Sequence, residues 1–271
     1  MKQEERAKLI DIFNDTEQWY ETDETLRAAV AHSIEETKFY APDEYPPLPE
    51  KKFEHTRLDV TRWRSFEAGW RARQETRNIR IGVLNFASAT MPGGGVKIGS
   101  GAQEECLCRC STLYPILKTS ANQKNFYRMH RVRRDPLHTD ACIYSPEILA
   151  VKSDIQFPAR LDPKYWLTVD VLTCAAPKLN SIEIKDEELF DIHTQRGRHL
   201  MTIAAHHGID VLILGAFGCG AFKNDPRVVA NAYKKILPEF DGFFDRIIFA
   251  VYCPTTYGRN YATFKKILKE E

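Results

Sequence analysis

The stretch V-L-N-F-A-S-A-T-M-P-G-G-G-V-K-I-G-S-G-A-Q-E-E, residues Val83–Glu105, decides the fold of this chain. It begins with an apolar run typical of a strand, passes the triple glycine Gly93–Gly95 and enters a helical stretch near Gly101. A strand that continues through a turn into a helix is a unit of layered α/β sheets. The stretch therefore predicts an α/β domain with a glycine-rich loop at a strand end.

The same alternation of strands and helices continues along the chain. Short apolar runs predict strands at Ile79–Ser88, Ala141–Val151, Trp166–Ala176, Val211–Gly215 and Arg246–Cys253. Helical patterns lie between or beside them, at Gly101–Leu117, Glu187–His207, Pro226–Leu237 and Arg259–Glu271. Several of the runs are apolar on both faces, as expected for strands buried inside a sheet. The pattern predicts an α/β sandwich.

The N-terminal part of the chain has a different pattern. Residues 3–40 carry apolar positions at near-helical spacing and predict two helices, followed by a proline-rich linker or extended strap at Ala41–Pro49. Thr61–Thr76 predicts one more helix. A chain of 271 residues is marginal for two large domains. We expect residues 1–57 to form a helical accessory segment of the main domain, 58–271, which packs on that domain and shapes one wall of a cleft; a dimer contact suits its pattern equally.

Composition excludes several classes of function. Lys and Arg total 38 against 37 Asp and Glu, so no global field attracts nucleic acid or an anionic membrane. No run approaches the roughly twenty apolar residues of a membrane span, and no apolar signal core follows the charged start Met1–Arg6. The seven cysteines lack zinc-ribbon or disulfide spacing. We therefore expect a reduced, intracellular (cytoplasmic) location and no metal site.

Two strand-to-helix loops stand out: loop 1, Ala87–Gly101, and loop 2, Gly215–Asp225. In open α/β sheets the binding crevice lies at the carboxyl ends of strands, where such loops meet. Loop 1 holds the triple glycine, and loop 2 ends where Asp225 can cap a helix that has Pro226 in its first turn. Glycines let a ligand approach main-chain amides, and helix starts add unpaired N–H groups. Two anion cradles in one domain predict a diphosphate ligand.

Gln103, Glu104 and Glu105 lie in the first turn of the helix that loop 1 enters. Acidic residues favour helix N-termini, which is a purely structural explanation. Two carboxylates beside an anion site repel the ligand, however, unless they act on it. Neighbouring helical residues project about 100° apart, so Glu104 and Glu105 do not flank one bond as the paired carboxylates of ordinary glycosidases do. Either they serve the helix alone, or they have separate roles toward a ligand.

The spacing of these motifs resembles that of a known family. The triple glycine Gly93–Gly95, seven residues and then Q-E-E resemble the signature of poly(ADP-ribose) glycohydrolases. The wider context is similar to the bacterial, microbial-type branch, with V-L-N-F-A-S-A from Val83, P-G-G-G from Pro92, A-Q-E-E-C-L-C-R from Ala102, L-Y-P from Leu113 and G-A-F-G-C-G-A-F-K-N-D-P from Gly215. This resemblance covers roughly residues 58–257. It implies a macrodomain-like three-layer α/β/α sandwich with a mixed central sheet, which cleaves the ribose–ribose O-glycosidic bond of poly(ADP-ribose) without a metal or other cofactor.

The resemblance also implies roles for individual residues. Glu105 is the expected catalytic acid/base, and Glu104 is expected to hold ribose hydroxyls. Asn85 and Phe222 are expected to contact the terminal ribose, and Gln103 belongs to the same substrate-binding set. The residues expected to bind the diphosphate through main-chain amides are Gly93, Gly94, Gly95, Gly218, Cys219, Gly220 and Ala221.

Three functional hypotheses stay open: a hydrolase of poly(ADP-ribose), a hydrolase of mono-ADP-ribosyl groups, and a module that binds ADP-ribose without turnover. The intact Gln103–Glu105 argues against the third, because a pure reader has no use for two carboxylates beside a phosphate. The expected partners are poly(ADP-ribose) or ADP-ribosylated proteins, with ADP-ribose as product, and neither a membrane nor a specific nucleic acid. The locally basic stretch Tyr127–His138 is expected to be a solvated connection, with some arginines in reach of an anionic polymer.

Overall fold

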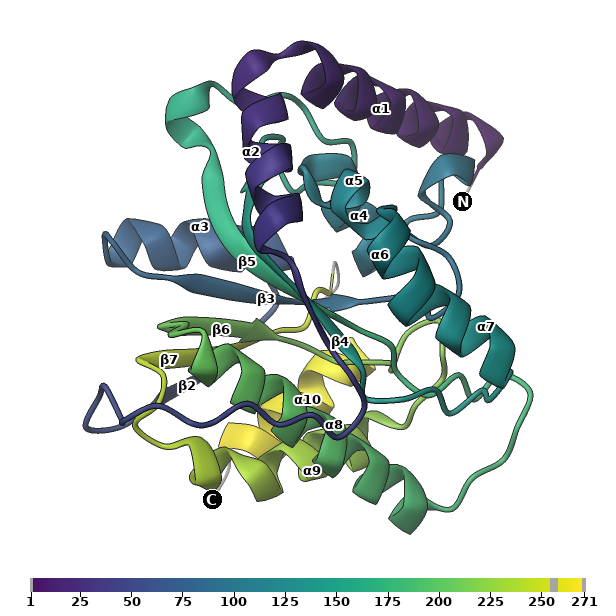
Figure 1. The fold of residues 1–271 in the computed structure, drawn as a ribbon. Helices are drawn as coiled ribbons and strands as arrows, with labels where there is room; N and C mark the ends of the chain where they lie inside the picture. The colour runs from purple at the N-terminus through teal and green to yellow at the C-terminus, as the bar shows by residue number, and fades with distance from the viewer. Residues whose placement is uncertain (1, 254–257, 270–271) are drawn as a thin grey trace.

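A computed structural model describes residues 2–253 and 258–269, and its centre is one mixed β-sheet (Figure 1). The described strands form a seven-stranded sheet in the order β1-β4-β5-β3-β6-β7-β2. Their bounds are β1 Lys38–Tyr40, β2 Arg57–Thr61, β3 Ile81–Phe86, β4 Cys142–Ala150, β5 Leu167–Cys174, β6 Val211–Leu214 and β7 Arg246–Ala250. Strands β5, β3, β6, β7 and β2 run parallel, β4 pairs antiparallel with β5, and β1 pairs antiparallel with β4 at the sheet edge. The carboxyl ends of the parallel strands therefore meet at one edge of the sheet.

Helices cover both faces of this sheet, so the predicted three-layer sandwich is confirmed (Figure 1). Val83 of β3 belongs to a core shared with helices on one face, and the next residue, Leu84, belongs to a second core on the other face. The helices of the first face are α1 Gln3–Thr22, α2 Glu24–Glu36, α3 Ser65–Glu75, α4 Gln103–Cys110, α5 Leu113–Leu117, α6 Ser120–Asn122 and α7 Met129–Arg133. Those of the second face are α8 Asp186–His206, α9 Pro226–Ile236 and α10 Arg259–Lys269.

The five predicted strands are confirmed, but three other predictions need correction. Strands β1 and β2 were not predicted, because β1 is very short and β2 carries charged residues at the sheet edge. Since β2 extends to Thr61, the helix that was expected to begin at Thr61 begins at Ser65. The helix expected over Gly101–Leu117 is divided at Ser111, which pairs with Ala150 of β4. The basic stretch Tyr127–His138 was expected to be a solvated connection, but its first part is helical. A π-helix over Gln123–Arg128 continues into α7 and buries Tyr127.

The segment before residue 57 packs along the domain. Helix α1 lies against the short 3-10 helix η1, Val96–Ile98, and against α4, where Thr16 Oγ1 donates to the Arg109 carbonyl over 2.7 Å. The proline-rich stretch Ala41–Pro49 forms the expected strap across α8. Among the described residues, none from α1 or α2 lines the cavity described below, so these helices support loop 1 from behind. None of the described helices is long and apolar enough to span a membrane.

Candidate active site

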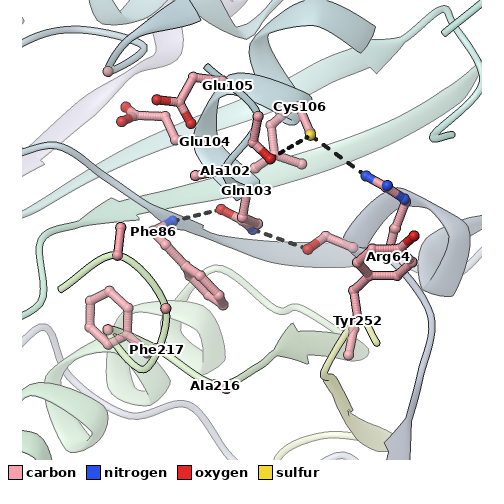
Figure 2. A pocket seen from close by; sticks show the side chains of 18 of the residues that line it. Arg64, Phe86, Ala102, Gln103, Glu104, Glu105, Cys106, Ala216, Phe217 and Tyr252 are labelled. Atoms are coloured by element: carbon pink, nitrogen blue, oxygen red, sulfur yellow. Dashed lines mark hydrogen bonds between the residues drawn. The ribbon is translucent and has the colours of Figure 1, made fainter. Parts of the chain in front are cut away.

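Loops 1 and 2 border one cavity of about 450 Å³ at the carboxyl edge of the sheet (Figure 2). The start of α4 supplies one wall and loop 2 the facing wall. Of the residues predicted for the site, those that line the cavity are Gly94, Gln103, Glu104, Glu105, Gly218, Gly220, Ala221 and Phe222. The predicted residues that do not line it are Asn85, Gly93, Gly95 and Cys219. The structure therefore brings both loops and both carboxylates to one place.

Loop 1 turns sharply at its glycines. Gly93 and Gly94 have φ of 67° and 55°, in the left-handed region that favours glycine. A Cβ on Gly94 would lie 2.6 Å from Glu105 Oε1 and 3.0 Å from Glu104 Oε2. Both carboxylates thus converge on Gly94, where a side chain would collide with them. Figure 2 shows them side by side at the start of α4.

Gln103 ties the start of α4 to the end of β3. Its Oε1 accepts from the Phe86 amide over 2.9 Å, and its Nε2 donates to the Leu84 carbonyl over 2.7 Å and to Ser65 Oγ over 3.0 Å (Figure 2). Both ends of this amide are thereby engaged within the protein. Gln103 lines the cavity, and its hydrogen bonds fix where the next two residues begin.

Glu104 is buried and held from one side. Its Oε2 accepts from the Ser88 amide over 2.7 Å, and its Oε1 has no hydrogen-bond partner among the described residues. Burial raises the pKa of the Glu104 carboxyl well above its usual range; the Ser88 amide opposes this rise, and the negative charge of Glu105 adds to it. A carboxyl in this environment tends to keep its proton.

Glu105 has the same arrangement on the other side of the turn. Its Oε1 accepts from the Gly95 amide over 2.8 Å, while its Oε2 is buried without a partner among residues 2–253 and 258–269. The side chain is 7% exposed and lines the cavity. Each carboxylate thus has one oxygen fixed by loop 1 and one oxygen left for a ligand, because buried polar groups normally find partners.

Asn85 lies beneath the carboxylates rather than in the cavity wall. It is fully buried in β3, and its Nδ2 donates to Thr173 Oγ1 over 3.2 Å. Its amide also lies near enough to Glu104 to lower the pKa of that carboxyl. The structure therefore connects Asn85 to the site through Glu104.

Loop 2 is organised by Asn224, which the sequence did not single out. The buried amide of Asn224 donates to the carbonyls of Pro177, over 2.7 Å, and Gly218, over 3.1 Å. Its Oδ1 lies 2.7 Å from His193 Nε2, and burial lowers the pKa of His193 to about 3, so the neutral ring donates this hydrogen bond. The sequence signal that could have indicated this role is an Asn in a glycine-rich loop, nine positions after Gly215.

The two loops differ in the main-chain donors they leave open. In loop 1, the Gly94 amide donates to Met91 O and the Gly95 amide to Glu105. In loop 2, the amides with no hydrogen-bond partner within the described chain include those of Gly218 and of the consecutive residues Gly220, Ala221 and Phe222. Asp225 caps α9 through the Arg227 amide, as predicted. Loop 2 therefore offers an anion three consecutive open donors, the amides of Gly220, Ala221 and Phe222.

Cys219 is not an activated nucleophile. Its thiol lies 3.6 Å from the Phe217 carbonyl, and burial raises its pKa. Among the described residues, no group of three His, Cys, Asp or Glu side chains could hold a metal ion.

The far end of the cavity contains residues that sequence reasoning missed. The Arg64 guanidinium lies 4.0 Å above the Tyr252 ring, and its Nη1 is 3.6 Å from Cys106 Sγ (Figure 2). Asp154 lies nearby and accepts from the Phe66 amide at the start of α3. Tyr252 follows β7, another parallel strand, and a residue just after such a strand could have been predicted to border the cavity. The sequence around Arg64 and Asp154 contains no comparable signal.

The layered mixed sheet, with a cleft that pairs two glycine-rich loops with two buried carboxylates, defines a macrodomain-type protein with an acid/base site suited to glycosidic bonds. The family model described as "Microbial-type PARG, catalytic domain" matches residues 9–153. The chain belongs to this microbial-type poly(ADP-ribose) glycohydrolase family and is a hydrolase of the glycosidase class.

Solved structures agree with this family. The poly(ADP-ribose) glycohydrolase from Thermomonospora curvata is 30% identical, with a TM-score of 0.84, covering 97% of this chain and 100% of that chain. Its complex with the inhibitor ADP-HPD is 31% identical, with a TM-score of 0.84 over 96% of this chain and 99% of that chain. The Deinococcus radiodurans enzyme in complex with ADP-ribose is 29% identical, with a TM-score of 0.76 over 88% of this chain and 96% of that chain. No curated protein sequence gives a match.

Proposed function

We propose that the cavity binds the terminal ADP-ribose unit of poly(ADP-ribose), and that Glu105 and Glu104 hydrolyse the ribose–ribose O-glycosidic bond to release ADP-ribose. The observation that carries the proposal is the pair of buried oxygens, Glu104 Oε1 and Glu105 Oε2, which have no partner among the described residues at a turn that only glycine fits. The family and the relatives bound to ADP-ribose and ADP-HPD support the choice of ligand.

The diphosphate is assigned mainly to loop 2. Its open amides at Gly218, Gly220 and Ala221 are the donors that an anion needs. Gly93–Gly95 of loop 1 allow close approach, although two of their amides are already engaged. Phe222 lines the cavity beside these amides and is assigned to pack on the terminal ribose.

Acid/base catalysis follows from how Glu105 is held. The Gly95 amide fixes Oε1, so Oε2 is the oxygen that faces the substrate. In the protonated form, Glu105 donates its proton to the departing ribose oxygen as the glycosidic bond breaks and an oxocarbenium-like centre develops. The resulting carboxylate then removes a proton from the attacking water, which restores the protonated acid. The nearby diphosphate stabilises the positive centre.

Glu104 is assigned to the ribose hydroxyls. The Ser88 amide fixes its Oε2, and its Oε1 remains for hydrogen bonding. Because burial raises the pKa of Glu104, this carboxyl can lie beside a diphosphate without adding a full second negative charge. The repulsion expected from two carboxylates at an anion site is thereby reduced.

The natural partners proposed are ADP-ribosylated proteins that carry the polymer, in the reducing cytoplasm. Cys106, Cys108, Cys110, Cys142, Cys174 and Cys219 are free thiols, which supports this location. Residues 1–57 are proposed as an accessory segment of the catalytic domain, 58–271; the packing of α1 behind loop 1 supports the accessory role.

A product analysis tests the proposed function. Purified protein is incubated with poly-ADP-ribosylated and, separately, with mono-ADP-ribosylated carrier protein, and released products are identified by mass. We expect free ADP-ribose from the polymer. Tight binding of ADP-ribose with no release from either substrate would assign the chain to ADP-ribose readers, and release from the mono-ADP-ribosylated carrier alone would assign it to mono-ADP-ribosyl hydrolases.

A further inference from the structure

A basic surface beside the cavity has no part in the chemistry described so far. No acidic residue occurs between Lys118 and Arg134, and the segment around α7 is rich in arginine. The exposed cations of this surface, which we call the basic ridge, are Lys124, Arg128, Arg131, Arg133, Arg134 and Lys178.

These cations lack the counter-charges found elsewhere on the protein. Arg198 pairs with Glu239, for example, and Arg246 with Asp59 and Glu75. Within the part of the chain that the structure describes, no ridge residue has a carboxylate within salt-bridge distance. The acidic neighbour along the chain, Asp135, accepts from the Leu137 amide. Clustered cations without carboxylate partners create a local positive potential on a chain of net charge +1.

The ridge lies at the carboxylate end of the cavity. Arg131 Nη1 donates to the Thr90 carbonyl of loop 1 over 2.7 Å, two residues beyond the Ser88 amide that holds Glu104. On the side of loop 2, the Lys178 amide donates to Pro136 O over 2.7 Å, and Lys178 follows closely on Ala176 in the cavity wall. Figure 1 shows α7 beside the carboxyl ends of the strands. Arg64 and Tyr252 mark the opposite end.

We propose that the basic ridge binds the diphosphates of the polymer that lies beyond the bond to be cut. The inference rests on the proposed function, which puts that bond at Glu105, so the remaining chain leaves the cavity at this end. Every further unit carries a diphosphate, and arginine pairs well with phosphate through its forked donors. The ridge thereby favours long polymer over a single ADP-ribosyl group.

The test variant removes three ridge charges without disturbing the fold. Arg128→Gln, Arg133→Gln and Lys178→Gln are combined, because these side chains are exposed and make no hydrogen bond or ion pair with other described residues. Arg131 is kept because its guanidinium donates to the Thr90 carbonyl. Arg134 is kept because its φ of 54° lies in the left-handed region, where a substitution would also change the backbone strain. The control combines exposed or half-buried cations remote from the ridge, namely Arg73→Gln, Arg77→Gln and Lys266→Gln.

Turnover and binding are measured on length-fractionated polymer over a range of salt. We expect kcat/KM on long polymer to fall about five- to tenfold at low salt, and the slope of log kcat/KM against log salt to flatten by about two. The Kd of free ADP-ribose and all values of the control variant should stay unchanged. The proposal would be overturned if the ridge variant kept the kcat/KM and the salt dependence of wild type. It would also be overturned if the ridge substitutions abolished binding to single-stranded DNA while turnover of polymer stayed unchanged.

A binding assay separates this inference from the proposed function. Long polymer is titrated against Glu105→Gln with and without the ridge substitutions. Weaker polymer binding in the combined variant supports the ridge even if wild-type protein were to release no ADP-ribose, a result that would count against the proposed function alone. Equal binding by the two proteins counts against the ridge alone.

Discussion

The main-chain amide of Gly95 donates a 2.8 Å hydrogen bond to Oε1 of Glu105, so the glycine loop itself orients the proposed acid/base. Ser88 does the same for Glu104 from the other side of the turn. Loop 1 is thus more than a cradle for phosphate. It fixes one oxygen of each carboxyl group and leaves the second oxygen of each for the substrate.

Replacing Gly94 tests this relationship. Gly94→Ala places a Cβ within 3.0 Å of both carboxylates at a φ of 55°, so we expect turnover of polymer to fall at least about 100-fold as the catalytic geometry is lost. Gly208→Ala is the matched control, with a φ of 69° and open space around its Cβ. It should lose about 1 kcal/mol of stability and keep full activity. Equal kcat in both variants would mean that the convergence on Gly94 has no catalytic role.

Asn224 is expected to be as important for binding as the glycines around it. Asn224→Ala removes the amide that holds Pro177 O and Gly218 O and leaves His193 without its partner. We expect a loss of about 2 to 3 kcal/mol in the free energy of unfolding and at least tenfold weaker ADP-ribose binding by calorimetry. Asn231→Ala, which removes an exposed amide from α9, is the control. Unchanged ADP-ribose affinity in Asn224→Ala would show that loop 2 does not depend on this residue.

The buried carboxyl of Glu104 makes stability depend on pH. In the unfolded chain this group ionises near its ordinary pKa of 4.5, and in the folded chain well above it, so the unfolded state binds fewer protons between these values and stability falls as pH rises. Glu104→Gln removes this penalty. We expect the variant to match wild type at pH 4 and to be about 1 to 3 kcal/mol more stable at pH 7, measured by urea unfolding. A difference that does not change with pH would contradict the buried, proton-retaining carboxyl.

Helix α1 is expected to unfold together with the sheet. Thr16→Val keeps the shape of the side chain but removes the buried hydrogen bond to Arg109 O, so global stability should fall by about 1 to 2 kcal/mol in a single transition. Thr22→Val, whose hydroxyl is exposed, should have little effect. A separate early transition for residues of α1, seen by hydrogen exchange, would instead show a loosely docked accessory segment.

Much of this architecture could be predicted from the sequence. The apolar runs gave the five long or buried strands, since burial on both faces leaves a strong pattern, and the order of Gly93–Gly95, Gln103–Glu105 and loop 2 indicated where the site forms. Edge strands β1 and β2 gave no such pattern, because one is three residues long and neither is fully buried.

The finer geometry of the site depended on contacts between distant residues. Which amides of loop 1 are engaged by Met91 and Glu105 is a property of the folded turn, and local sequence does not encode it. The same is true of the Asn224 to His193 hydrogen bond, which joins residues 31 positions apart. Arg64 reaches the cavity only because α3 begins beside α4.

Glu105→Gln is the most direct test of the central claim that Glu105 is the acid/base of a poly(ADP-ribose) glycohydrolase. The substitution keeps the size of the side chain and an acceptor for the Gly95 amide but removes the titratable proton. Release of ADP-ribose from polymer and the Kd of ADP-ribose are measured on the same preparation. The account predicts a fall in kcat of about 100- to 10,000-fold with nearly unchanged Kd. Full release of ADP-ribose by this variant would contradict it.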